Sequence, residues 1–406
     1  MKTQFKVGLV AICMILLLFS GQSQAQNSNR GRYIVTIQRP ISNAVRAMGG
    51  QVIYEYSIIP AIAIEIPNTA LQGLARNPNV IRIEPDAVAW ALPSTPAGSA
   101  KRPTTSRKPT PTPTPQPEQY IPWGVDRIDA EFSGQTGDGV NVAVIDTGID
   151  YNHQDLAGNY KGGINIVRPR KAPMDDNGHG THVAGIIAAI DNEIGVVGVA
   201  PQANLYAVKV LNAAGLGSYA DIIAGIDWCY KTEGIEIDVI NMSLGGTLYS
   251  EAMKDACDNA KTVGIVVVVA AGNEATKGNP VVYPAAYDSV IAVAATDKND
   301  QRAYFSSYGS YVDIAAPGVN IDSTLPGDKY SGETWSGTSM ASPHVAGTVA
   351  LIIQSYNYEY SVDGIRDILI DTADDLGELG FDYFYGNGLV DAAEAATGNE
   401  TGNDLP

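Results

Sequence analysis

Cysteine is scarce in this sequence, and so are long apolar runs. There are three cysteines in 406 residues, and Cys13 falls inside an apolar stretch at the start of the chain. The remaining two, Cys229 and Cys257, permit only one disulfide in an exported protein. Two separate buried thiols are the alternative, and the sequence leaves that choice open.

Only the first apolar run has the composition of a targeting segment. Lys2 and Lys6 precede the run at 7–19, and a small-residue cleavage site follows at 23–25. This pattern predicts a signal peptide at 1–25. A membrane anchor is the alternative, but the run is shorter than the about 20 residues that a bilayer requires. Later apolar runs have the length of strands, so we expect a secreted protein, extracellular or periplasmic, with no membrane segment in its mature form.

Positive charge is the third scarce feature. Lys and Arg number 26 against 44 Asp and Glu, which gives a formal net charge of −18. Residues 118–406 hold 14 of the basic residues and 40 of the acidic ones. An acidic protein is repelled by nucleic acid and by anionic membranes and attracts cations, so we expect no nucleic-acid partner.

A segment rich in proline and threonine divides the chain. Eight of the 23 prolines lie in 93–117, which has no apolar periodicity and therefore predicts an extended linker. On either side we expect a small domain at 26–92 and a large domain at 118–396, with a flexible tail at 397–406.

The small domain alternates strand-like and helix-like stretches in the order βαββαβ, which is the order of the ferredoxin-like fold. Strands are expected at 33–37, 52–56, 61–66 and 80–84, and helices at 42–48 and 69–76. A domain of this size is marginally stable alone, which suits a folding assistant that acts on a partner domain.

The large domain contains Val- and Ile-rich runs without polar alternation. They lie at 140–145, 205–210, 239–242, 265–271 and 290–294. Such strands are buried on both faces, which predicts an α/β fold with a twisted, mainly parallel sheet and helices on both faces. Functional residues in such folds lie beyond the carboxyl ends of the strands.

Polar residues at strand ends and helix starts are the candidates for chemistry. Asp146 and Asn273 each follow an expected strand, whereas His179 and Ser339 each open an expected helix. Taken singly, each is also what a turn or a helix cap would use. His182 lies three residues after His179 and invites a metal interpretation, but the Glu of the His-Glu-x-x-His zinc-protease motif is absent.

Together these residues can supply the parts of a nucleophilic site. A serine hydroxyl is a weak nucleophile at neutral pH, so it needs an imidazole base, and the imidazole needs a carboxylate that fixes its tautomer. Amides at a helix start can stabilise an oxyanion. The chain has one well-placed candidate for each role.

The order Asp, His, Asn, Ser and the surrounding motifs resemble the subtilisin-like serine proteases (subtilases) over about 119–395. The similar stretches are Val-Ile-Asp-Thr-Gly-Ile at 144–149, His-Gly-Thr-His-Val-Ala-Gly at 179–185, Asn-Met-Ser-Leu-Gly-Gly at 241–246, Ala-Ala-Gly-Asn at 270–273 and Gly-Thr-Ser-Met-Ala-Ser-Pro-His-Val-Ala-Gly at 337–347.

The resemblance implies a secreted serine endopeptidase. Ser339 would attack the scissile carbonyl, His179 would carry the proton and Asp146 would orient the imidazole. The Ser339 amide and the Asn273 side chain would form the oxyanion hole. A catalytically silent binding protein on the same fold is the alternative, and the filled catalytic positions weigh against it.

The resemblance also implies where substrate binds. An extended peptide would lie between Ser243, Leu244 and Gly245 on one side and Gly217, Ser218 and Tyr219 on the other. Tyr219, Ile222 and Leu244 would line an apolar pocket a few residues upstream of the cut, and the primary pocket would lie beside Ala270 to Gly272. Val282 stands where many relatives carry a smaller residue, so a preference for large aromatic side chains does not follow.

Calcium, in a structural role, is the cofactor that the resemblance implies. Its ligands would be Gln119, Asp155, Ile190, Asn192, Ile194 and Val196, several of them through backbone carbonyls. Hard cations require such a set of oxygen ligands. A plain loop after the His179 helix is the alternative.

The small domain resembles the subtilisin propeptide, which serves as inhibitor and intramolecular chaperone and is cut autocatalytically. The resemblance predicts processing after Leu92. The linker at 93–117 departs from the family pattern, because it stands between this cut and the catalytic match at Gln119. It could stay as a tail, be trimmed, or place the cut elsewhere. We expect the mature enzyme to be a monomer that acts on proteins and peptides.

Overall fold

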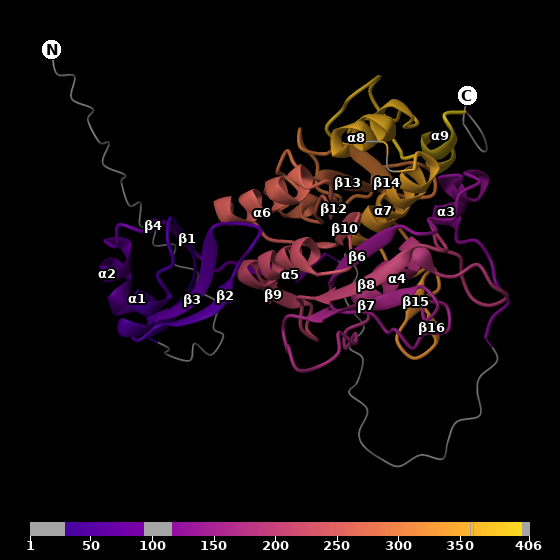
Figure 1. The fold of residues 1–406 in the computed structure, drawn as a ribbon. Coiled ribbons are helices and arrows are strands. Elements are labelled where there is room, and N and C mark those ends of the chain that lie inside the picture. The colour runs from indigo at the N-terminus through magenta and orange to yellow at the C-terminus, as the bar shows by residue number, and fades with distance from the viewer. Residues whose placement is uncertain (1–28, 93–115, 358, 360, 400–406) are drawn as a thin grey trace, which may run out of the picture.

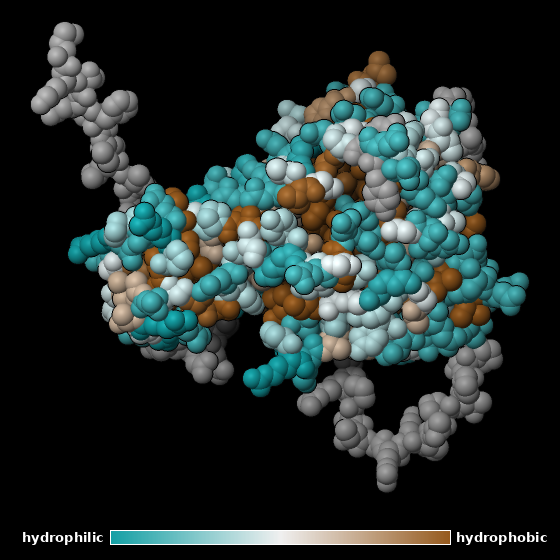
Figure 2. Space-filling view, viewed as in Figure 1, coloured by the Kyte–Doolittle hydropathy of each residue, from teal (hydrophilic) through white to brown (hydrophobic). Residues whose placement is uncertain are grey.

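The computed structural model describes residues 29–92, 116–357, 359 and 361–399 (Figure 1). The expected signal peptide, most of the expected linker and most of the tail lie outside these residues. Within them, no helix combines the length and the apolar composition needed to cross a membrane. The face shown in Figure 2 is mainly hydrophilic, with small hydrophobic patches.

The small domain has the element order expected from the sequence. It consists of β1 (Arg30–Ile37), α1 (Ser42–Ala47), β2 (Gln51–Glu55), β3 (Ala61–Pro67), α2 (Leu71–Ala75) and β4 (Val80–Pro85). The sheet order is β2-β3-β1-β4 with antiparallel pairs, which is the ferredoxin-like arrangement. Val45 of α1 and Leu74 of α2 are buried against strand residues such as Val35 and Ile64.

The large domain is built on a seven-stranded sheet in the order β14-β13-β12-β10-β6-β8-β7, in which every pair is parallel. The strands of this sheet are β6 (Asn141–Asp146), β7 (Tyr160–Asn165), β8 (Asn204–Lys209), β10 (Val239–Met242), β12 (Val266–Ala270), β13 (Ile291–Thr296) and β14 (Ile314–Pro317). The expectation of an α/β fold with a mainly parallel sheet is confirmed. The edge strands β7 and β14 were not predicted.

Helices cover both faces of this sheet. They are α3 (Trp123–Arg127), α4 (His179–Ala188), α5 (Tyr219–Lys231), α6 (Glu251–Thr262), α7 (Thr338–Ser355), α8 (Val362–Asp371) and α9 (Ala392–Thr397). Side chains alternate across a strand, and accordingly Val142 and Val144 of β6 join one buried cluster with α4 and α7. Ala143 and Ile145 join a second cluster with α5 and α6.

The strand order reverses at β6, because the chain adds β8 on one side of it and β10 on the other. In parallel sheets such a reversal opens a crevice at the carboxyl ends of the strands. Asp146 ends β6 and Ser243 follows β10, so both lie at this crevice.

A short strand connects the two domains. β5 (Val88–Ala91) pairs antiparallel with β9 (Leu216–Ser218) on one side and with β11 (Leu244–Gly245) on the other. The small domain lies beside α5 and α6 (Figure 1). A hairpin of β15 (Thr324–Leu325) and β16 (Lys329–Tyr330) completes the described elements.

Candidate active site

Asp146 and His179 form a buried pair. Asp146 is the last residue of β6, and His179 is the first residue of α4. The imidazole Nδ1 lies 2.8 Å from Asp146 Oδ1 and 2.9 Å from Oδ2. The His179 side chain is 1% exposed and the Asp146 side chain 0%. A carboxylate at this position holds the proton on Nδ1 and leaves Nε2 available as a base. His179 Nε2 is buried without a hydrogen-bond partner among the described residues.

Ser339 is the second residue of α7 and is fully buried. Its hydroxyl donates to the Ser243 carbonyl at 3.0 Å, and its own carbonyl accepts from Ser243 Oγ at 2.9 Å. The structure therefore joins Asp146 to His179 directly, but it directs the Ser339 hydroxyl toward Ser243 and not toward the imidazole. Hydrogen bonds between catalytic groups often form only with substrate in place.

The Asn273 side chain donates a hydrogen bond to the backbone carbonyl of Leu92. Its Oδ1 accepts hydrogen bonds from the backbone N and the Oγ1 of Thr338, at 2.9 and 3.0 Å. These bonds fix the orientation of the amide, and its Nδ2 donates to the Leu92 carbonyl. Thr338 Oγ1 also accepts from Gly272 N at 3.1 Å. Thr338 was not among the predicted residues, although its place directly before the candidate nucleophile could have indicated a role.

The chain segment ending at Leu92 occupies the crevice as an extended strand. Trp90 is paired with Leu216 of β9, and Ala91 with Leu244 of β11. Leu92 N lies 3.4 Å from the Ser243 carbonyl oxygen, and the Leu92 side chain is buried. Most of the predicted substrate-binding positions therefore contact or flank this strand. They are Gly217, Ser218, Ser243, Leu244 and Gly245.

The chain just before Leu92 is buried against the large domain. Ala89 is fully buried and belongs to the same hydrophobic cluster as Tyr219, Ile222 and Leu244. These three are the residues predicted for an apolar pocket a few positions before the cut. Ala89, three residues before Leu92, thus belongs to the same part of the core as the residues predicted for this pocket.

Two glycines and a valine shape the surroundings of Leu92. A Cβ added to Gly245 would lie 3.5 Å from Leu92 Cδ1 and only 2.6 Å from Val282 Cγ1. One added to Gly272 would lie 2.7 Å from Val282 Cγ2. Both glycines are therefore required for Val282 to fit in the surroundings of Leu92. Ala270, also predicted here, is fully buried at the end of β12.

Acidic residues of the small domain cap helices of the large one. The Glu84 carboxylate accepts from Glu251 N at 2.8 Å and from Ala252 N at 3.2 Å, at the start of α6. Asp86 accepts from Ala220 N at 2.8 Å, at the start of α5. Unpaired N–H groups and the positive end of the helix dipole favour carboxylates at these positions.

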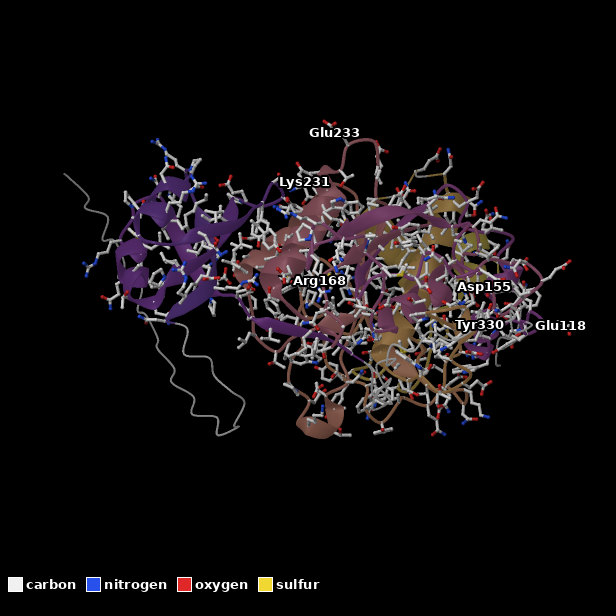
Figure 3. All side chains as sticks on the ribbon, turned by 90° about the horizontal axis from the view of Figure 1, so that it is seen from below. Glu118, Asp155, Arg168, Lys231, Glu233 and Tyr330 are labelled. Atoms are coloured by element: carbon white, nitrogen blue, oxygen red, sulfur yellow. The ribbon has the colours of Figure 1, made fainter. Side chains whose placement is uncertain are left out.

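The residues predicted to bind calcium converge around Asp155. Its Oδ1 accepts from Asn192 Nδ2 at 2.8 Å, and its Oδ2 accepts from Val196 N at 3.3 Å and Tyr330 OH at 2.8 Å. Gln119 Oε1 accepts from Asn192 N at 2.5 Å. Asp155 and Tyr330 lie at the end of the large domain opposite the small domain (Figure 3).

The chemistry of this loop fits a hard cation. Ile190 N donates to the Asp155 carbonyl at 2.9 Å, and Ile194 N donates to Asn192 Oδ1 at 2.7 Å, so the whole predicted set is contiguous. The described residues contain no cluster of three or more His, Cys, Asp or Glu side chains. The predicted set has one carboxylate and otherwise neutral oxygens, which calcium accepts and zinc does not favour.

His182 and His344 are buried and have contacts that suit a structural role. His182 Nε2 lies 3.0 Å from Ser331 Oγ, and its ring stacks on Trp335 with centroids 4.8 Å apart. Burial lowers its pKa to about 3. His344 Nδ1 lies 2.8 Å from the Met340 carbonyl, and burial lowers its pKa to about 4. Both are neutral at physiological pH.

Cys229 and Cys257 are free and buried. They lie on α5 and α6, and burial raises the pKa of each thiol. Of the two alternatives that the sequence left open, the structure has two separate thiols.

Comparison with known proteins gives consistent similarities. Residues 137–388 match the model of the subtilase family. The chain is 41% identical to subtilisin NAT of Bacillus subtilis subsp. natto over 391 residues, which is 93% of each chain. It is 48% identical to subtilisin DY of Bacillus licheniformis over 283 residues, which cover 68% of this chain and 99% of that one. A thermostable alkaline protease of Halalkalibacterium halodurans is 39% identical over 401 residues, 97% and 99% of the two chains.

Proposed function

Because the chain belongs to the subtilase family and is a serine endopeptidase of the subtilisin type, we propose that Asp146, His179 and Ser339 are its catalytic triad. Asn273 is the side-chain donor of the oxyanion hole. The observation that carries this proposal is the Leu92 carbonyl, which accepts from Asn273 Nδ2 at the end of a strand bound between β9 and β11.

The Leu92 carbonyl marks the position of a scissile carbonyl. The Ser339 hydroxyl gives up its hydrogen bond to the Ser243 carbonyl and passes its proton to His179 Nε2. Its oxygen attacks the carbon of the scissile carbonyl. Asp146 accepts a hydrogen bond from His179 Nδ1–H throughout and stabilises the imidazolium. The negative charge on the carbonyl oxygen is bound by Asn273 Nδ2 and by the Ser339 N–H, which lies in the first turn of α7, where the helix itself provides no acceptor.

The second half of the reaction reverses these roles. The imidazolium of His179 gives its proton to the leaving amine, which departs with the downstream peptide. Water then attacks the acyl-enzyme and loses a proton to His179 Nε2. As the tetrahedral intermediate collapses, the imidazolium returns this proton to Ser339 Oγ, and the free serine hydroxyl and the peptide acid are regenerated and released. Peptides are substrates because the flanking strands bind them mainly through backbone hydrogen bonds.

The pockets favour a substrate similar to the chain's own segment. A leucine-sized side chain suits the primary pocket, because Val282 occupies space between Gly245 and Gly272. A small side chain suits the pocket of Tyr219, where Ala89 is fully buried.

Calcium bound at Asp155 stabilises the enzyme. Gln119, Asp155, Ile190, Asn192, Ile194 and Val196 are the residues that hold it. These residues would hold a calcium ion through oxygen atoms, and the ion would supply positive charge beside the Asp155 carboxylate. It takes no part in the chemical step.

Residues 26–92 are a propeptide that inhibits the enzyme and is removed by it. Burial of Leu92, the pairing of β5 in the crevice and the helix caps at Glu84 and Asp86 support this role. The protein is exported through the signal at 1–25, is cut after Leu92, and works as a secreted monomer.

Replacement of Ser339 by Ala tests the proposal. The parent protein should hydrolyse casein, and a serine-directed phosphonate should label Ser339, as located by mass spectrometry. The Ser339→Ala precursor should remain uncut and inactive although it folds. Labelling of another serine, or normal maturation of the variant, would contradict the assignment.

A further inference from the structure

A buried carboxylate outside the triad lies between the segments that carry Asp146 and His179. Asp175 is 5% exposed. Its Oδ1 accepts from Thr147 Oγ1, Asn177 N and Gly178 N, each at 2.9 Å. Its Oδ2 accepts from the N and Oγ1 of Thr181 at 3.0 and 2.6 Å. All five partners can donate to an ionised carboxylate, which has acceptor sites for them, whereas burial raises the pKa of Asp175.

Two threonines extend these contacts to both halves of the pair. Thr147 follows Asp146, and its Oγ1 accepts from the N–H of Gly180, the residue after His179, at 2.8 Å. Thr181 lies on α4, and its Oγ1 accepts from Asp150 N at 3.0 Å. Each threonine thus connects the turn at 146–150 with the start of α4, and Asp175 connects the two threonines.

The start of α4 depends on this carboxylate. The N-cap residue is Gly178, which has no side chain to cap the helix. Asp175 supplies the missing acceptor, since it binds Gly178 N and Thr181 N. The helix also approaches the turn closely, because a Cβ added to Gly180 would lie 2.1 Å from the Gly148 carbonyl oxygen.

We propose that Asp175 is a positioning residue for catalysis, which acts through Thr147 and Thr181 to fix the position of His179 relative to Asp146. This inference rests on the proposed triad. The imidazole must face both the carboxylate and the reacting hydroxyl, and a misplacement of about 1 Å in such a geometry costs roughly 100-fold in rate. None of the five hydrogen bonds of Asp175 involves the bound segment at 88–92, so its effect should fall on kcat and not on KM.

Replacement of Asp175 by Asn is the first test. Whichever oxygen becomes the amide nitrogen, two or three of the five donors lose their acceptor. We expect kcat per titrated active site to fall roughly 10- to 100-fold, with KM changed by no more than about threefold. In the Ser339→Ala background, the downfield proton resonance of His179 Nδ1–H should broaden or move, because this proton reports directly on the bond to Asp146.

A pair of variants at Thr147 separates the hydroxyl from packing and keeps the proposal testable if Asp175→Asn does not fold. Thr147→Val keeps the shape but removes the link between Asp175 and Gly180, and it should lower kcat in the same range. Thr147→Ser keeps the hydroxyl and should recover most of the parent kcat.

Asp382 provides the matched control. It is 7% exposed and accepts from Glu378, Phe384 and Tyr385 backbone N–H groups, in a loop away from the triad. Asp382→Asn should lower the thermal midpoint without changing kcat or the His179 resonance. Equal loss of kcat in Asp382→Asn and Asp175→Asn would overturn the inference, and so would an unchanged kcat in both Asp175→Asn and Thr147→Val.

Asp146→Asn distinguishes this failure from failure of the triad itself. If Asp146→Asn is inactive while Asp175→Asn is fully active, the triad stands and the positioning role is wrong. If Asp146→Asn keeps full activity, the triad assignment fails and the role of Asp175 fails with it.

Discussion

Val282 offers a direct test of how the primary pocket selects substrates. It is fully buried and lies close to both Gly245 and Gly272, the residues that flank the pocket. Val282→Ala removes two methyl groups from this space. A methylene in an apolar pocket is worth about 1–3 kcal/mol of discrimination, and burial alone accounts for about 0.8 kcal/mol per methylene. We therefore expect the ratio of kcat/KM for phenylalanine over leucine at the cut to rise roughly 10- to 100-fold.

The assay compares two peptide anilides, acetyl-Ala-Trp-Ala-Leu and acetyl-Ala-Trp-Ala-Phe, on the same enzyme sample. Any loss of folded enzyme cancels in the ratio. Val281→Ala is the matched control, because Val281 is the preceding residue and is 45% exposed. The reasoning is refuted if Val282→Ala leaves the ratio unchanged, or if Val281→Ala changes it equally.

Three further predictions concern calcium, pH and processing. Chelation should lower the thermal midpoint of the parent protein. Asp155→Asn should abolish this calcium dependence, whereas Asp258→Asn on α6 should retain it. An unchanged response in Asp155→Asn would exclude Asp155 as a calcium ligand. Burial lowers the pKa of His344 from 6.5 to about 4. Between these two values the imidazole is protonated in the unfolded chain but not in the folded one, so the folded protein loses stability as the pH is lowered. Between pH 7 and 5 this term amounts to about 2 kcal/mol. In urea unfolding of the Ser339→Ala precursor, adding His344→Gln should reduce the loss of stability between pH 7 and 5 by that amount. Equal losses with and without His344→Gln would contradict the lowered pKa of His344. Leu92 is followed by Pro93, whose nitrogen is part of a ring and carries no N–H; we expect this bond to be cut slowly and Pro93→Ser to speed maturation, as followed by mass spectrometry, and equal rates would argue against it.

The sequence predicted the strands that are buried on both faces, because their Val and Ile runs carry the signal themselves. It missed β7, which lies at the sheet edge and contains Gly162 and Gly163. A Cβ added to Gly163 would lie 2.0 Å from the Ala207 carbonyl oxygen, so the close approach of two backbones requires glycine and removes the apolar pattern. The edge strand β14, Ile-Ala-Ala-Pro, was missed because it has one β-branched residue and ends in proline, so it lacks a Val- and Ile-rich run.

The candidate site, too, could be predicted from the sequence only in part. Local motifs predicted Asp146, His179, Asn273 and Ser339 as site residues, because each stands at a strand end or helix start. They could not give the direction of the Ser339 hydroxyl, which depends on a single side-chain torsion. Asp175 was missed because it lies in a polar loop that reads as a turn. Its five donors come from residues up to 28 positions away, and this convergence exists only in the folded chain.

The contacts of the small domain bear on how its proposed inhibition would end. Its own core is small, with seven fully enclosed residues such as Val45, Leu74 and Ile64. Other apolar residues, Ile58 and Ile59, are buried in the cluster of the large domain instead. Glu84 and Asp86 likewise find their partners at the starts of α6 and α5. While the domains are covalently joined, these contacts form at a high effective concentration. If residues 26–92 are the proposed propeptide, each dissociation after the cut exposes a domain that is only marginally stable alone. The dissociated domain would then be a substrate for the enzyme, so that release would proceed in one direction.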